Sequence, residues 1–201
     1  MAFYKLHIGQ AREFVEGNSS NDWEAIRCSK NPGHQRAGKR TTDLMLDVVS
    51  WNVVDFSQTM LSDVVVTDHA QKVLRNAELT GFLVRPTRIM GLPAQLRDAT
   101  FPRLWEFVVV GQGGPAHKDS GIVTLRRCDE CGLVEYSAFE HGIVVDPSTY
   151  DGSDFFVVAE YPKYVLVSGR AKSVIESNRL TNASFLESTR LQWPKGVIRP
   201  K

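Results

Sequence analysis

The stretches VVVTDHAQKVL (residues 64–74) and VLVSGRAKSVI (residues 165–175) share one pattern. Each begins with an apolar run rich in β-branched residues, which is typical of a strand. A hydroxyl residue follows, Thr67 or Ser168, and its side chain can cap the free N–H groups at the start of a helix. Apolar residues then recur at helical spacing, so that one face of the helix would pack on a sheet. Both stretches therefore predict a strand followed directly by a short helix.

The resemblance between the two stretches continues on both sides. Downstream, each copy reaches a Leu-Thr pair and then a Phe-Leu strand, which we expect to end at Thr87-Arg88 or at Thr189-Arg190. Upstream, each copy follows a further apolar stretch, so that the internal resemblance relates residues 45–90 to 154–192. Duplication and convergence both account for such a repeat. We predict an α+β fold with two similar strand–helix–strand units on a mostly antiparallel sheet.

The composition is that of an ordinary globular protein. The 201 residues are 42% hydrophobic and 23% charged, and such a chain can bury a sizeable core. The formal net charge of +1 provides no field that would attract nucleic acid or an acidic membrane surface. No apolar run approaches the ~20 residues of a membrane span. We expect a single compact domain over residues 1–201 that does not act at a membrane.

The N-terminus and the cysteines indicate the compartment. Residues 1–8 alternate between apolar and polar side chains, which predicts a first strand rather than a signal peptide. Three cysteines without a secretion signal are typical of a reducing compartment and not of a disulfide framework. The expected location is the cytoplasm.

The segment Cys128-Asp129-Glu130-Cys131-Gly132 has the form Cys-x-x-Cys-Gly. Two thiolates at this spacing can bind one tetrahedral metal ion, and the glycine after the second cysteine permits a tight turn. The flanking residues alternate between apolar and polar, which predicts a half-buried hairpin. This zinc knuckle, at residues 128–132, would supply half of a zinc site.

The remaining cysteine, Cys28, is followed by an Asn-Pro-Gly turn and by His34. Residues 28–34 therefore resemble a second knuckle in which a histidine replaces a thiolate, with a wider spacing than usual. We predict that Cys28, His34, Cys128 and Cys131 bind one structural zinc ion per chain.

Three alternatives to this site remain open. His117 or His141 could be the fourth ligand, because both lie within a dozen residues of the second knuckle. Cys28 and His34 could also be unrelated loop residues. A redox role for the Cys-x-x-Cys pair is disfavoured, because a strand follows it and the acidic residues between the cysteines would raise a thiolate pKa.

The chain contains no recognisable pattern of an enzyme. It has no Gly-x-Ser-x-Gly elbow, no His-Glu-x-x-His pair and no phosphate-binding loop, so no catalytic residues are expected. The alternative is a zinc-ribbon-like adaptor for nucleic acid or protein, because Lys39-Arg40 and Arg126-Arg127 lie near the knuckles. Acidic residues next to these arginines disfavour nucleic acid as the partner.

The order of these features resembles that of the double-CXXCG group of bacterial immunity proteins. The matching segments are Phe3-Tyr4-Lys5-Leu6 at the start, Leu46-Asp47-Val48-Val49-Ser50 in the centre and Phe185-Leu186-Glu187 near the end. The second knuckle matches fully, whereas the first keeps Cys28 but has no second cysteine. The resemblance implies a cytoplasmic, non-enzymatic immunity protein, stabilised by zinc, that binds and neutralises a cognate toxin.

Overall fold

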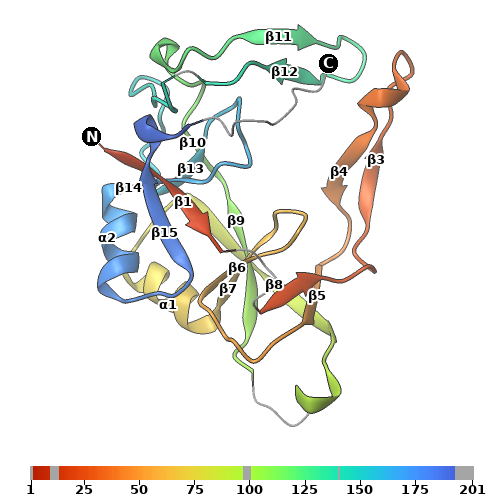
Figure 1. Cartoon of the computed structure of the whole chain (residues 1–201), viewed down its shortest axis with the longest axis vertical. Coiled ribbons are helices and arrows are strands. Elements are labelled where there is room, and N and C mark those ends of the chain that lie inside the picture. Colours follow the sequence, from red (N-terminus) through yellow and green to blue (C-terminus); the bar gives the residue numbers. More distant parts are fainter. Residues whose placement is uncertain (1, 10–13, 97–100, 140, 193–201) are drawn as a thin grey trace.

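The computed structural model describes residues 2–9, 14–96, 101–139 and 141–192, and strands dominate it (Figure 1). The strands are β1 (Phe3–Ile8), β2 (Val15–Gly17), β3 (Trp23–Ile26), β4 (Arg36–Arg40), β5 (Leu44–Val48), β6 (Phe56–Gln58), β7 (Val64–Thr67), β8 (Phe82–Gly91), β9 (Leu104–Val109), β10 (Gly111–Gln112), β11 (Thr124–Arg127), β12 (Val134–Tyr136), β13 (Phe155–Val157), β14 (Leu166–Ser168) and β15 (Ala183–Glu187). The helices are α1 (Asp68–Asn76), α2 (Gly169–Ser177) and the short 3-10 helices η2 (Pro32–His34), η3 (Ala94–Leu96), η4 (Lys118–Ser120) and η5 (Ser188–Arg190). The fold is thus of the α+β class. The last nine residues of the predicted domain, 193–201, lie outside the described residues.

Both α-helices begin where the sequence places their caps. The Thr67 hydroxyl accepts a hydrogen bond from the Ala70 N–H at 3.1 Å, and the Ser168 hydroxyl accepts one from the Ala171 N–H at 3.1 Å. Each helix has nine residues, which is too short for stability in isolation. The helices therefore depend on the apolar faces that they bury against the sheets.

Two large sheets contain most of the strands. Their orders are β2-β5-β8-β9-β7-β6 and β10-β13-β14-β1-β15. The described pairings are antiparallel except for β5 with β8 and β10 with β13. In neither sheet do the strands before and after a helix pair with each other. Instead β9 lies between β7 and β8, and β1 lies between β14 and β15.

Three apolar clusters form the core. The largest takes residues from both helices and from both large sheets. Because side chains alternate along a strand, neighbouring residues enter different clusters: Phe155 belongs to the shared cluster and Phe156 to a second one. Val66 and Val65 divide in the same way between the shared cluster and a third. Each large sheet is therefore covered on both faces.

Two hairpins, β3–β4 and β11–β12, stand apart from this core at the right and the top of Figure 1. Among residues 18–43 and 123–138, none belongs to the three clusters or packs against them. All four residues of β11 are exposed, so the prediction of a half-buried hairpin was wrong for this strand. No apolar layer of the described residues lies over β11.

The base of the β3–β4 hairpin is held by an ion cluster. Arg40 Nη2 lies 2.5 Å from Glu106 Oε1 in β9, and Arg40 Nη1 lies 3.0 Å from Asp63 Oδ1. The Arg40 and Glu106 side chains are only 8% and 10% exposed. Ion pairs with so little access to water are screened weakly, and the loss of one partner leaves a buried charge.

The predicted strand ends at the Thr-Arg pairs were wrong in both copies. Strand β8 continues to Gly91, because its last residues pair with β5. Strand β15 ends at Glu187, and Thr189-Arg190 lie in η5. There the Ser188 carbonyl accepts a hydrogen bond from the Ile143 N–H at 2.8 Å, so that a loop contact replaces strand pairing.

Candidate metal centre

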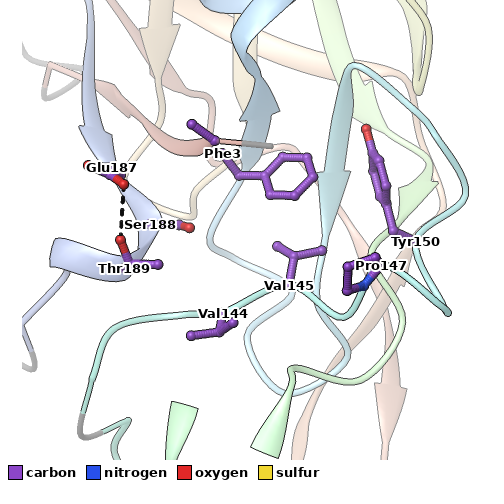
Figure 2. A pocket seen from close by; sticks show the side chains of 9 residues that line it. Phe3, Val144, Val145, Pro147, Tyr150, Glu187, Ser188 and Thr189 are labelled. Atoms are coloured by element: carbon purple, nitrogen blue, oxygen red, sulfur yellow. Dashed lines mark hydrogen bonds between the residues drawn. The ribbon is translucent and has the colours of Figure 1, made fainter. Parts of the chain in front are cut away.

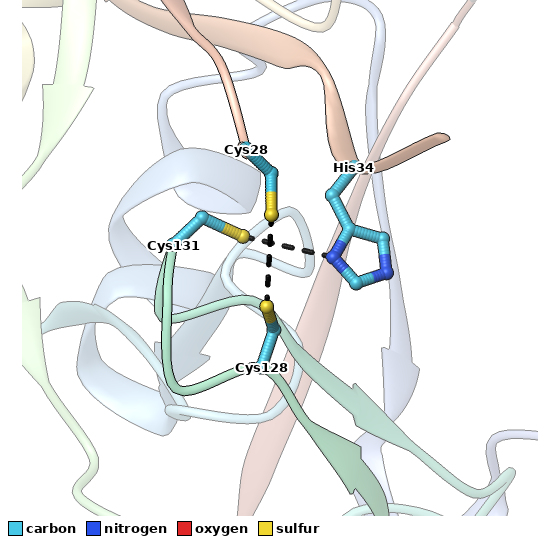
Figure 3. A group of neighbouring side chains, drawn as sticks. All are labelled: Cys28, His34, Cys128 and Cys131. Carbon is cyan, nitrogen blue, oxygen red and sulfur yellow. Dashed lines mark hydrogen bonds between the residues drawn. The ribbon is translucent and has the colours of Figure 1, made fainter. Parts of the chain in front are cut away.

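Cys28, His34, Cys128 and Cys131 come together between the tips of the two hairpins (Figure 3). Their possible ligand atoms all lie within 4.8 Å of one another. The sulfurs of Cys28 and Cys128 are 3.8 Å apart, and Cys131 Sγ lies 3.7 Å from His34 Nδ1. A tetrahedral zinc ion with Zn–S bonds of about 2.3 Å would hold two sulfur ligands about 3.8 Å apart. The three cysteines are free, and the spacing of the group fits one tetrahedral ion.

The second knuckle turns as its sequence predicts. The Gly132 N–H donates to the Cys128 carbonyl at 2.9 Å, and the Cys128 N–H donates to the Leu133 carbonyl at 2.8 Å. Gly132 has a φ of +67°, in the left-handed region that glycine enters without a steric penalty. The turn directs the sulfurs of Cys128 and Cys131 to the same side of the hairpin, toward Cys28 (Figure 3).

The first knuckle reaches the same geometry by a different turn. The Asn31 side chain accepts a hydrogen bond from the Gly33 N–H at 2.9 Å and starts the one-turn helix η2, which ends at His34. This turn accommodates the wide spacing between Cys28 and His34. The nitrogen of the Asn31 amide lies 3.0 Å from His34 Nε2, and the other ring nitrogen, Nδ1, faces the sulfurs.

Polar contacts also join the two hairpins around this group. Arg36 Nη2 donates to the Cys131 carbonyl at 2.9 Å, and Arg36 Nη1 lies 3.6 Å from Cys131 Sγ. The Ser29 hydroxyl donates to Glu130 Oε1 at 2.8 Å, and Lys30 Nζ lies 3.7 Å from the same carboxylate. Sequence reasoning did not identify Arg36, although a cation two residues after His34 was visible.

The environment of the thiols differs from the expectation for a knuckle with acidic residues between its cysteines. A backbone hydrogen bond at Leu133, together with contacts from Arg36 and His34, lowers the pKa of Cys131 to about 6. Burial raises the pKa of Cys28. The backbone amide and the guanidinium at Cys131 lower the pKa of this thiol, so the predicted rise of the thiolate pKa was wrong for this residue.

We expect Arg36→Ala to weaken zinc binding by roughly 10–100-fold, because outer partners of metal ligands typically contribute that much. The guanidinium both orients the Cys131 carbonyl and favours the thiolate. Zinc affinity is measured by competition with a chromogenic chelator. Lys39→Ala is the matched control, since Lys39 is an exposed cation of the same strand. Equal affinities of the two variants would contradict the role of Arg36.

The other histidines considered as fourth ligand lie outside the group. His117 Nδ1 contacts Asp119 Oδ2 at 3.3 Å, and His141 lines a separate surface depression beside η5. Of the three histidines, the structure brings His34 to the sulfurs.

Replacing His34 by alanine is therefore expected to lower zinc affinity by roughly 100-fold or more, beyond the usual effect of an outer partner. His117→Ala should leave the affinity unchanged. Both variants are titrated with zinc in the same chelator competition. If the zinc affinity of the His34 variant were unchanged, His34 would not be the fourth ligand and another group would have to take this position.

A cavity of about 300 Å³ lies elsewhere, beside β1 and β15 (Figure 2). Its lining residues are Ala2, Phe3, Val144, Val145, Pro147, Tyr150, Glu187, Ser188 and Thr189. Three of its polar side chains are engaged with neighbours: the Thr189 hydroxyl donates to Glu187 Oε1 at 3.2 Å, and the Tyr150 hydroxyl donates to the Ser153 carbonyl. Burial raises the pKa of Tyr150 to about 12, which keeps this phenol protonated at neutral pH. None of the lining residues belongs to the metal group.

No model of a known protein family matches the chain. No curated protein matches it either. Within the described residues, no helix is both long and apolar enough to cross a bilayer.

Proposed function

We propose that the four residues hold one structural zinc ion and that the chain is a non-enzymatic immunity protein, which binds and neutralises a cognate bacterial toxin in the cytoplasm. The observation that carries the proposal is the complete set of four protein ligands at tetrahedral spacing. A catalytic zinc ion keeps one position for water or substrate, whereas a structural one is enclosed by four protein ligands. Three thiolates and one imidazole favour zinc over harder cations.

Toxin binding is supported by the resemblance to the double-CXXCG group and by the place of the ion. An inhibitor needs a rigid surface of about 800 Å² on its side of a standard interface, and it needs no catalytic residues. The two hairpins lie outside the apolar clusters, and an ion between their tips would hold them rigidly.

The test is to search the neighbouring reading frames for a large protein with a candidate toxic C-terminal domain and to co-express that domain with the chain. We expect the chain to restore growth and to co-purify with that domain as a stable complex. Growth arrest in the presence of the chain, together with the absence of a complex, would contradict toxin neutralisation. Metal content of the purified chain, measured by mass spectrometry, tests the zinc site separately.

The exposed strand β11, which carries Arg126 and Arg127, favours a second candidate, a zinc-ribbon-like adaptor for nucleic acid or protein. Arg126 Nη2 is engaged by Glu135 Oε1 at 2.6 Å, which reduces the charge available to a phosphate backbone. Retention on heparin that falls steeply with salt would support the adaptor over the immunity protein.

A further inference from the structure

We propose that the chain consists of two equivalent half-chains, residues 3–91 and 104–192, and that each half is the docking partner of the other. The first indication is the register of β1 and β9. Leu104 of β9 lies opposite Thr67 of β7, and Phe3 of β1 lies opposite Ser168 of β14. The two pairs are related by a displacement of 101 positions: Phe3 corresponds to Leu104, and Thr67 corresponds to Ser168. Every residue pair between β9 and β8 has a counterpart between β1 and β15 at the same displacement.

The two halves exchange their first strands. The order β6-β7-β9-β8 in one sheet corresponds to β13-β14-β1-β15 in the other. Strand β9 comes from the second half and completes the sheet of the first, while β1 comes from the first half and completes the sheet of the second. Without this exchange, each sheet would have two unpaired strand edges in its middle. In this arrangement, each half therefore depends on a strand of the other half to complete its sheet.

Two aspartates make the same reciprocal contact across the boundary. Asp55 accepts hydrogen bonds from the N-cap hydroxyl of α1 at 2.8 Å and from the Thr181 N–H of the other half at 2.9 Å. Asp154 accepts from the N-cap hydroxyl of α2 at 2.7 Å and from the Thr80 N–H of the other half at 3.0 Å. In each case the aspartate connects the start of one helix to a threonine four residues beyond the end of the other helix.

The largest apolar cluster is built from corresponding residues of the two halves. Burial at equivalent positions on both sides is the property of an interface between two copies of one surface. The corresponding pairs in the cluster at a displacement of 101 positions are Leu6 and Phe107, Val66 and Val167, Ala70 and Ala171, Leu74 and Ile175, and Leu79 and Leu180. Phe56 and Phe155, displaced by 99 positions, correspond by register, because they lie opposite Val66 and Val167.

The metal group is divided between the halves in the same way. The β3–β4 hairpin of the first half supplies Cys28 and His34, and the β11–β12 hairpin of the second supplies Cys128 and Cys131. Both hairpins carry a register shift after their first residue pair. A metal ion at this place would lock one half to the other.

One charge difference makes the halves complementary rather than identical. Glu106 of β9 pairs with Arg40, whereas the equivalent residue of β1 is Lys5, which lies over the Tyr164 ring at 4.2 Å. A first half that docked on a second copy of itself would place Lys5 against Arg40. The surface of each half therefore fits the opposite half, from the same chain or from another copy of the chain.

The experiment uses the full-length chain with a protease site in the connection between β8 and β9. After cleavage, we expect the two halves to elute as one particle of unchanged mass, in zinc-containing buffer. Two cleaved variants, C28S·H34A and C128S·C131S, are then mixed, unfolded and refolded with zinc. Because random reassortment reunites the two intact half-sites, up to about one particle in four should regain the metal. The same two variants left uncleaved should regain far less, since each defective half stays tied to its intact partner.

Separation of the halves after cleavage would overturn the proposal. So would a mixture that recovers no metal although cleaved wild-type protein recovers its own on refolding. If the cleaved wild-type halves do not reassociate after unfolding and refolding, this result would also contradict the docking of one half on the other. Particle mass measured again with a chelator in place of zinc tests the docking without the metal, whereas absence of metal from the intact protein would contradict only the zinc site proposed above.

Discussion

Replacing Cys128 and Cys131 together by serine is expected to abolish metal binding and to release both hairpins, while the rest of the chain stays folded. Two of the four ligands are lost, and apparent zinc-binding free energies of structural sites are on the order of 10–16 kcal/mol at neutral pH. The hairpins contribute no residue to the three apolar clusters, and a two-stranded hairpin is marginal by itself. We therefore expect a metal ion at this site to stabilise the hairpins more than the core.

Limited trypsin digestion with mass spectrometry measures this effect. In the double variant, cleavage at the exposed residues Arg27 and Lys30 should accelerate at least tenfold, while the far-UV circular dichroism of the core persists. Asp129→Ser is the matched control, because this exposed residue lies between the same two cysteines and is no ligand. Full metal content in the double variant would rule the site out. Loss of all cooperative unfolding would show instead that the ion stabilises the whole chain.

Local patterns in the sequence predict the local features of this structure. The hydroxyl caps at Thr67 and Ser168 and the tight turn at Gly132 each depend on a few adjacent residues. Such interactions are short in sequence separation, so propensity and spacing describe them well. The Cys-x-x-Cys pair belongs to the same class.

Features that depend on distant residues are less visible in the sequence. His34 could not be preferred firmly over His117, because it reaches the knuckle only through the placement of two hairpins about 100 positions apart in the chain. The alternation around β11 predicts burial, but alternation cannot tell whether another layer covers the strand. The exchange of β1 and β9 is invisible for the same reason. One signal was available: Glu106 is a lone acid within an otherwise apolar strand, and such a residue needs a buried partner.

The buried partner of Glu106 is Arg40, and disrupting this pair is expected to have the second large effect on the protein. Glu106→Lys is expected to destabilise the protein by about 3–5 kcal/mol, because it leaves Arg40 facing a second cation in a site with little access to water. For a chain of this length, such a loss lowers the melting temperature by on the order of 10 °C. Chemical denaturation with urea measures the free energy of unfolding directly, and the m-value shows whether the compactness of either state has changed.

Two further variants separate the buried ion pair from a general effect of charge. Asp43→Asn removes the carboxylate partner of Arg88 in an exposed pair, and it should cost no more than about 1 kcal/mol. The double variant R40M·E106L replaces the two most buried ions by apolar side chains, and it should recover part of the stability that Glu106→Lys loses, because Asp63 then lacks its partner Arg40. If Glu106→Lys were as stable as the wild type, the ion cluster would not hold the β3–β4 hairpin, and the charge difference between β9 and β1 would not decide which half docks on which. If Glu106→Lys is destabilised and R40M·E106L is clearly more stable than Glu106→Lys, the pairing of Glu106 with Arg40 is what makes the two halves complementary.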